Sequence, residues 1–151
     1  MRSRPLVVLA EDNEDTRRVY GLILQHFGYE VKEATNGVEA VRVTRECQPS
    51  LVLMDIGLPG LDGWQASRML KSDPATHRIP LVAFSARIDS TADLGGDASF
   101  DGYMLKPISP RELVRRIDAY LRLLGVQTPR HSVEPDASEL GESEGQTEAL
   151  V

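Results

Sequence analysis

The sequence predicts an α/β fold with a doubly wound parallel sheet and helices on both of its faces. Three runs of consecutive apolar residues, at positions 6–10, 51–54 and 81–84, are typical of strands that are buried on both sides. Segments with the spacing of amphipathic helices separate the strands, so that a β-α unit occurs five times along the chain. Right-handed crossovers turn such a repeat into a parallel sheet.

The first two β-α units have recognisable ends. Asn13 can cap a helix that ends before Gly28. The run 29–34 is more polar and is expected to be an edge strand, and Asn36 with Glu39 forms a cap-like pair before the second helix. The apolar faces of these helices are expected to contain Val19, Leu22 and Ile23 with His26 or Phe27, and Val38, Val41 and Val43.

The last helix is the most strongly marked. Ser109 and Glu112 have the spacing of a capping box, with Pro110 in the first helical position, and Gly125 ends the helix. Its apolar residues at helical spacing are Leu113, Val114, Ile117, Tyr120, Leu121 and Leu124.

Charge divides the chain of 151 residues into two parts. Residues 126–151 contain six acids against Arg130 alone, a net −5 of the total −6, so residues 1–125 are close to neutral. We therefore expect one folded domain over residues 1–125 and an acidic, disordered tail over residues 126–151. The acidic balance argues against nucleic acid as a direct partner.

Composition also restricts location and metal chemistry. Cys47 is the only cysteine, which excludes an internal disulfide and a cysteine-rich metal site. The apolar run before Glu11 is too short for a secretory signal or a membrane span, so a cytoplasmic protein without membrane insertion is expected.

Polar side chains follow four of the predicted strands. Glu11 and Asp12 end the first strand, Asp55 the third, Ser85 the fourth and Lys106 the fifth. Each alone has an ordinary interpretation, as a helix-start acid, a turn residue or a solvated charge. Because the carboxyl ends of parallel strands lie at one edge of a sheet, where ligands bind in such folds, together they predict a functional site.

Three neighbouring carboxylates repel one another and require a compensating cation. Oxygen ligands without His or Cys favour a hard ion, and Mg²⁺ is expected, with Mn²⁺ as a substitute. A carboxylate can act as a nucleophile and form an aspartyl phosphate, while a metal and a lysine neutralise charge on the phosphoryl oxygens. The hydroxyl of Ser85 can donate a hydrogen bond to such an oxygen.

Four motifs around these residues resemble the receiver domains of two-component response regulators, the CheY-like family. The resemblance covers roughly residues 5–124, with the motifs in the order and nearly the spacing of the family. The motifs are Val8-Leu9-Ala10-Glu11-Asp12-Asn13, Met54-Asp55-Ile56-Gly57-Leu58-Pro59-Gly60-Leu61-Asp62-Gly63, Phe84-Ser85-Ala86 and Gly102-Tyr103-Met104-Leu105-Lys106-Pro107.

The resemblance implies a flavodoxin-like (βα)5 fold with strand order 2-1-3-4-5. It also implies that Asp55 accepts a phosphoryl group from a histidine kinase or a histidine phosphotransfer protein. The ligands of Mg²⁺ would be Glu11, Asp12, Asp55 and the backbone carbonyl of Gly57, with Glu11 acting through water.

The same resemblance assigns the residues of the response. Ser85 and Lys106 would contact the phosphoryl group, and the bond between Lys106 and Pro107 would be cis. Ser85 would move toward the phosphoryl group and Tyr103 would turn inward, which changes the surface of the fourth helix, fifth strand and fifth helix. By position alone, Tyr103 is an ordinary half-buried strand aromatic.

Two departures from the family pattern concern the segment after the fourth strand and the loop after the third. Gly95 and Gly96 interrupt residues 89–100, so a short, partly unwound fourth helix is expected. Arg87 and Gly57 occupy positions that tune the lifetime of the phosphoryl group in the family by controlling access of water.

The predicted protein is a stand-alone phosphoacceptor signalling domain rather than an enzyme, although it would promote its own phosphotransfer and autodephosphorylation. It would act on a downstream protein target and could form a phosphorylation-linked dimer. One alternative is the N-terminal part of a longer regulator, and another is an interaction module that works without phosphorylation. A hydrolase of the haloacid dehalogenase kind would need Asp at position 57, where this chain has Gly.

Overall fold

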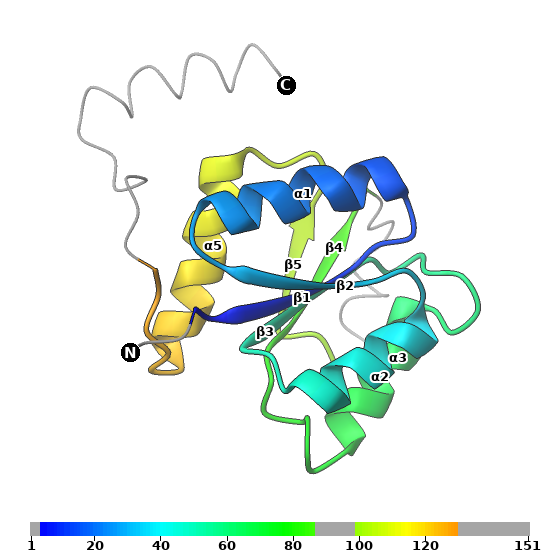
Figure 1. The fold of residues 1–151 in the computed structure, drawn as a ribbon. Coiled ribbons are helices and arrows are strands. Elements are labelled where there is room, and N and C mark those ends of the chain that lie inside the picture. The colour runs from blue at the N-terminus through cyan, green and yellow to red at the C-terminus, as the bar shows by residue number, and fades with distance from the viewer. Residues whose placement is uncertain (1–3, 87–98, 130–151) are drawn as a thin grey trace, which may run out of the picture.

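The computed structural model describes residues 4–86 and 99–129, and these residues form a parallel sheet with helices on both faces (Figure 1). The strand order β2-β1-β3-β4-β5 is the one predicted. The strands are β1 (Leu6–Ala10), β2 (Glu30–Ala34), β3 (Leu51–Met54), β4 (Leu81–Ser85) and β5 (Gly102–Leu105). The helices of the described residues are α1 (Glu14–His26), α2 (Gly37–Cys47), α3 (Gly63–Ser72) and α5 (Pro110–Leu123).

The sheet separates two hydrophobic cores. Helices α1 and α5 cover one face and α2 and α3 the other (Figure 1). Because successive strand residues point to opposite faces, Val7 and Leu9 of β1 belong to the core under α1 and α5, whereas Val8 and Ala10 belong to the core under α2 and α3. This burial on both sides explains why β1, β3 and β4 are uninterrupted apolar runs.

Strand β2 lies at the edge of the sheet, as its polar sequence predicted, and among the described strands it pairs with β1 alone. Its residues Glu30, Lys32 and Glu33 are exposed. Charged side chains on an edge strand oppose pairing with another sheet.

The predicted helix starts are present. The side chains of Asn13, Asn36 and Ser109 accept hydrogen bonds from backbone N–H groups of the first turns of α1, α2 and α5. The complete capping box lies elsewhere, between Asp62 and Gln65 at the start of α3. At α5 the carboxylate of Glu112 accepts instead from Arg115, at 3.5 Å.

The predicted apolar faces of α1 and α2 are wrong at three positions. Val19, Leu22 and Val38 are 53%, 60% and 65% exposed. Helix α1 is turned so that Tyr20 and Leu24, four residues apart, face the sheet, and the ring of Tyr20 meets that of Phe84 edge-on at 4.7 Å. Leu124, which was assigned to the apolar face of the last helix, is also 55% exposed.

Three predictions lie wholly or largely outside the described residues. These are the short fourth helix expected within residues 89–100, of which only 99 and 100 are described, Arg87, and the acidic tail expected over residues 126–151, of which only 126–129 are described. Among the described helices, none is both long enough and apolar enough to cross a membrane.

Candidate functional site

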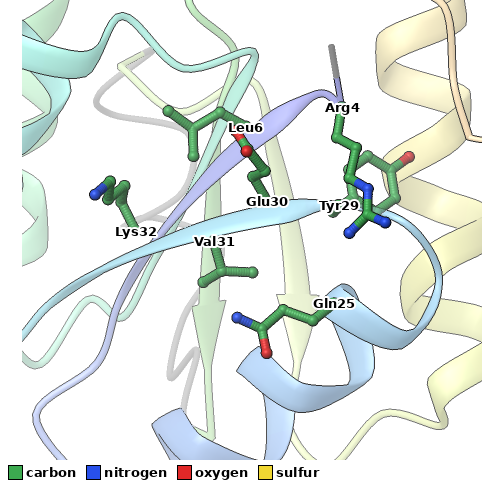
Figure 2. Close-up of a pocket in the computed structure, with 7 residues that line it drawn as sticks. All are labelled: Arg4, Leu6, Gln25, Tyr29, Glu30, Val31 and Lys32. Carbon is green, nitrogen blue, oxygen red and sulfur yellow. The ribbon is translucent and has the colours of Figure 1, made fainter. Parts of the chain in front are cut away.

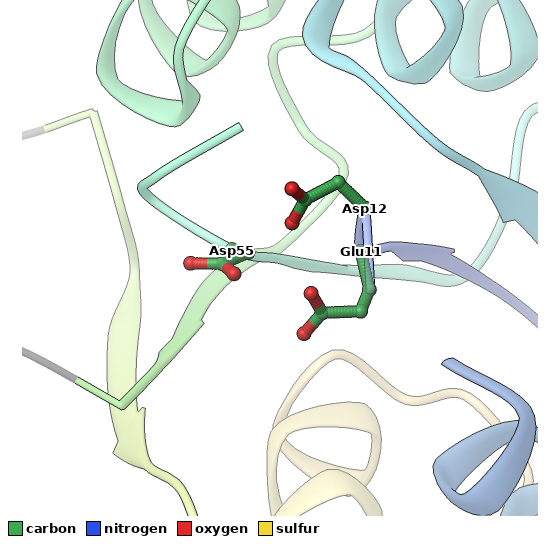
Figure 3. Close-up of side chains that lie close together, drawn as sticks. All are labelled: Glu11, Asp12 and Asp55. Atoms are coloured by element: carbon green, nitrogen blue, oxygen red, sulfur yellow. The ribbon is translucent and has the colours of Figure 1, made fainter. Parts of the chain in front are cut away.

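Three carboxylates meet at the carboxyl edge of the sheet. Strands β1 and β3 are neighbours, with Ala10 in register with Met54, so the residues that follow them lie side by side. Ligand atoms of Glu11, Asp12 and Asp55 all lie within 4.8 Å of one another (Figure 3). We call these three residues the acid cluster. The strand-end argument therefore predicted correctly that these three acids lie together at this edge.

Lys106 reaches the acid cluster from the far strand β5. Its backbone N–H donates to the carbonyl of Ser85 at 2.9 Å, which ties the end of β5 to the end of β4. The peptide bond between Lys106 and Pro107 is cis, as the family resemblance implied. The Nζ atom of Lys106 donates to the carboxylate of Glu11 and lies 3.4 Å from Oδ2 of Asp55.

Glu11 is the buried member of the acid cluster, with 2% of its surface exposed. Its Oε2 atom accepts the backbone N–H of Asn13 at 3.1 Å. Burial raises the pKa of Glu11, and the hydrogen bond from Lys106 partly offsets that rise. Burial alone would lower the pKa of Lys106, but its contact with Glu11 and the charge of Asp55 outweigh burial and raise it.

Asp55 is held with both carboxylate oxygens oriented. Oδ1 accepts the backbone N–H of Gly57 at 3.0 Å, and Oδ2 faces Lys106. The side chain of Asp55 keeps 14% of its surface exposed, so a reagent can reach it from solvent. An oriented, partly exposed carboxylate beside an ammonium group is suited to attack an electrophile whose charge the ammonium then stabilises.

Two glycines allow the close packing around Asp55, and the sequence alone did not identify them as part of the site. A Cβ atom on Gly63 would lie 2.5 Å from the carbonyl oxygen of Asp55 and 2.7 Å from Cα of Ile56. A Cβ atom on Gly37 would lie 1.7 Å from the carbonyl oxygen of Leu61. Helices α3 and α2 therefore begin directly against the loop that follows β3, and a larger residue would displace that loop.

The other predicted site residues lie nearby. Ser85 ends β4 and is 6% exposed, beside the backbone of Lys106. Tyr103 on β5 is half-buried, and its ring lies 6.0 Å from that of Phe100. Phe100 in turn meets Trp64 of α3 edge-on at 5.2 Å, so Trp64 packs against the core under α2 and α3.

The donor set of the acid cluster fits a hard divalent cation. Its side-chain donors are all carboxylate oxygens, which Mg²⁺ prefers and which softer metals do not select. Among the described residues, three carboxylates face one ammonium, that of Lys106, so these groups together retain negative charge that a cation would neutralise.

Comparisons with known proteins point to one protein family. A model of the response regulator receiver domain matches residues 7–118. The DNA-binding response regulator MtrA of Mycolicibacterium paratuberculosis is 36% identical over 124 residues, which are 81% of this chain and 52% of that protein. The phosphate regulon transcriptional regulatory protein PhoB of Pseudomonas aeruginosa is 36% identical over 120 residues, 79% of this chain and 52% of that protein. The chain thus spans about half the length of these curated relatives.

Solved structures share the fold. The receiver domain of the sensor histidine kinase PA1611 of Pseudomonas aeruginosa, described with a magnesium ion coordinated in its active site cleft, has a TM-score of 0.73 and 28% identity over 80% of this chain and 99% of that one. The chemotaxis response regulator CheY4 of Vibrio cholerae has a TM-score of 0.71 over 78% of this chain and 98% of that one, and its 20% identity supports the fold alone.

The fold and the acid cluster define a signalling domain of the two-component type. The chain belongs to the response regulator receiver domain family, whose model matches it over residues 7–118.

Proposed function

We propose that Asp55 accepts a phosphoryl group from a phosphohistidine of a histidine kinase or a histidine phosphotransfer protein. The observation that carries this proposal is the position of Asp55, which is oriented by Gly57 and Lys106 and remains partly exposed within the acid cluster. In the transfer, one oxygen of Asp55 attacks the phosphorus, the bond from phosphorus to the histidine nitrogen breaks, and that nitrogen keeps the electron pair. The product is an aspartyl phosphate.

Glu11, Asp12 and Asp55 would hold Mg²⁺, together with the backbone carbonyl of Gly57. When bound, the ion supplies positive charge that neutralises phosphoryl oxygens during transfer. Lys106 supplies a second positive charge at the Asp55 carboxylate, and its raised pKa keeps it protonated. In autodephosphorylation, water would attack the phosphorus, the bond from phosphorus to the Asp55 oxygen would break, and inorganic phosphate and the free Asp55 carboxylate would be released.

The response to phosphorylation would begin at Ser85 and Tyr103. The new phosphoryl group adds about −1.5 to −2 charges and acceptor oxygens, toward which the hydroxyl of Ser85 can donate. Tyr103 is placed to transmit this change to α5, because its backbone carbonyl accepts a hydrogen bond from Arg116 at 2.9 Å. Gly57 would tune the phosphoryl lifetime together with Arg87, which lies outside the described residues.

The receiver domain would comprise residues 1–125, followed by the acidic segment 126–151, and it would act in the cytoplasm on a protein target. A second candidate is the receiver part of a longer regulator. It is favoured by the matched relatives, which are about twice as long as the matched region and carry the names of a DNA-binding and a transcriptional regulator. In that case contact with nucleic acid would belong to the rest of the protein.

Phosphorylation by a small donor tests the proposal. The full chain is treated with acetyl phosphate and Mg²⁺, and its intact mass is followed. We expect one phosphoryl group on the wild type and on the control variant Asp62→Asn, in which the amide can still cap α3, and none on Asp55→Asn. An unchanged mass of the wild type, with Trp64 fluorescence also unmoved by beryllofluoride, would favour an interaction module that works without phosphorylation.

A further inference from the structure

A groove of about 440 Å³ opens beside the edge strand β2 (Figure 2). Its lining mixes apolar side chains with charges of both signs, and includes Leu6, Val31, Arg4, Lys32 and Glu30. Such a lining selects no particular ligand, and we assign no partner to this groove. The aromatic side chains beside the acid cluster, in contrast, have a defined partner in Lys106.

The ammonium of Lys106 lies over the ring of Phe84. Its Nζ atom is 5.4 Å from the centroid of that ring. Phe84 on β4 is in register with Met104 on β5, and both residues belong to the core under α1 and α5. Because side chains alternate along a strand, Lys106, two residues after Met104, starts on the same side of the sheet as the ring. A cation within about 6 Å of a ring centroid is attracted by the negative face of the ring.

Tyr20 of α1 contacts both the ring of Phe84 and the backbone that follows Lys106. Its own ring meets that of Phe84 edge-on at 4.7 Å. Its hydroxyl accepts the backbone N–H of Ile108 at 3.3 Å. Tyr20 and Phe84 are 8% and 1% exposed, so the surrounding core holds both rings in place. We call Tyr20 and Phe84 the aromatic pair.

The ammonium of Lys106 needs such support because a lysine side chain is long and flexible. It donates to Glu11 and lies 3.4 Å from Oδ2 of Asp55. Both of these carboxylates also belong to the acid cluster, whose donor set fits a cation. An aromatic ring attracts an ammonium but offers no carboxylate oxygen to a metal. The contact with Phe84 can therefore persist when Glu11 and Asp55 turn toward a bound cation.

We propose that Phe84 and Tyr20 are positioning residues for phosphoryl transfer, which hold the ammonium of Lys106 beside Asp55. This inference rests on the proposed function and deepens it. The aromatic pair acts through Lys106 and not on the phosphoryl group itself. Positioning of this kind affects rate strongly, because a displacement of about 1 Å at a reacting site can cost about 100-fold.

A double-mutant cycle tests the proposal in the full chain. Phe84→Leu should slow phosphorylation by acetyl phosphate with Mg²⁺ by about tenfold, because the ammonium of Lys106 loses its support. In the background Lys106→Gln the same substitution should cause no further slowing, since the group that it positions is absent. The control Phe27→Leu makes the same change against the same core, at the C-terminal end of α1, and should leave the rate unchanged.

Two further variants separate the aromatic face from the packing of the core. A trifluorinated phenylalanine at position 84 keeps the shape of the side chain and weakens the negative potential of its ring face. It should slow phosphorylation when Lys106 is present and not in Lys106→Gln. Tyr20→Phe removes the acceptor of the Ile108 N–H and should give a smaller slowing. Equal slowing by Phe84→Leu in the two backgrounds, or none when Lys106 is present, overturns the proposal.

NMR of the Lys106 side chain provides a test that does not depend on phosphorylation. The methylene protons next to its ammonium lie near the ring face, so the ring current should shift them upfield from ordinary lysine values. The shift should disappear in Phe84→Leu and remain in Phe27→Leu. Ordinary Lys106 signals in a chain that is phosphorylated contradict the role of the aromatic pair alone. A wild type that takes up no phosphoryl group contradicts the proposed function instead.

Discussion

Polar side chains gather at both ends of the strands, and the two places differ in how their polar groups are paired. At the carboxyl edge, the three carboxylates of the acid cluster face one ammonium, and Asp12 and Asp55 remain reachable from solvent. At the amino ends of the strands, the hydroxyl of Tyr29, which directly precedes β2, donates to the carboxylate of Asp118 on α5. These residues are 0% and 4% exposed.

This difference separates function from stability. The Tyr29–Asp118 pair joins a buried donor to a buried acceptor, so it fixes α5 to the turn before β2. The acid cluster has excess negative charge and access to solvent, which suits it to bind a cation, and we propose that Asp55 within it accepts a phosphoryl group. Substitutions in the acid cluster should therefore alter phosphorylation and Mg²⁺ binding, and substitutions in the Tyr29–Asp118 pair should alter the free energy of unfolding.

The largest effect is expected for Lys106→Gln. This removes the one ammonium that lies at Asp55 in the described part of the chain, and it should slow phosphorylation by acetyl phosphate by about 100-fold or more, because charge on the phosphoryl oxygens is no longer stabilised. Mg²⁺ affinity, measured by Trp64 fluorescence, should not fall, since the three carboxylates keep their charge. The control Lys71→Gln removes a lysine that pairs with Asp101 at 2.8 Å, away from the cluster. Equal slowing of phosphorylation in Lys106→Gln and Lys71→Gln would contradict the assignment of the chemistry to the acid cluster.

Gly63→Ala should affect both Mg²⁺ binding and the free energy of unfolding. Its Cβ would meet the backbone of Asp55 at 2.5 Å, so α3 or the loop after β3 must move, at a cost of about 1–3 kcal/mol in unfolding free energy. We also expect weaker Mg²⁺ binding. Gly21→Ala is the control, because the nearest atoms there are 3.9 Å away. Unchanged Mg²⁺ affinity in a folded Gly63→Ala variant would show that the glycine does not position the acid cluster.

Tyr29→Phe should change stability alone. Loss of its hydroxyl removes a buried donor from Asp118, which costs about 1–3 kcal/mol in urea unfolding. Tyr120→Phe, which removes a hydroxyl from the same helix that carries Asp118, serves as the control. A slower phosphorylation of Tyr29→Phe, with stability unchanged, would reverse the roles assigned to the two places.

The pair also predicts an alkaline limit to stability. Burial, together with the neighbouring Asp118 carboxylate, raises the pKa of Tyr29 above its ordinary value. The unfolded chain therefore loses the Tyr29 proton before the folded chain does. Stability from this group is complete below about pH 10 and falls by about 1.4 kcal/mol per pH unit above it. Unfolding of Tyr29→Phe should show a weaker dependence between pH 10 and 11, and an identical dependence would contradict the assignment.

The sequence predicted the sheet and the acid cluster because both follow from local patterns. Uninterrupted apolar runs identified β1, β3 and β4, and parallel strand direction brought their terminal residues to one edge. The buried faces of the helices were harder to predict. In α1, Val19 and Leu22 form one apolar stripe and Tyr20 and Leu24 form another, and only packing against the sheet decides which stripe is buried.

Contacts that depend on how two elements pack, rather than on where strands end, could not be predicted. The Tyr29–Asp118 hydrogen bond joins residues 89 positions apart. The role of Gly63 depends on how closely α3 approaches the backbone of Asp55, which is a distance between elements. A glycine after a strand indicates a loop in the sequence, whereas its close approach becomes visible only in three dimensions.

The location of the phosphoryl group tests the central claim most directly. The chain is phosphorylated with acetyl phosphate and Mg²⁺ and reduced with borohydride, which converts an acyl phosphate to an alcohol, and its peptides are then mapped by mass spectrometry. We predict that the reduced residue is at position 55 alone, and that omission of Mg²⁺ abolishes it. Reduction at Glu11 or Asp12, or none at all in a phosphorylated chain, would contradict the assignment of Asp55 as the phosphoacceptor.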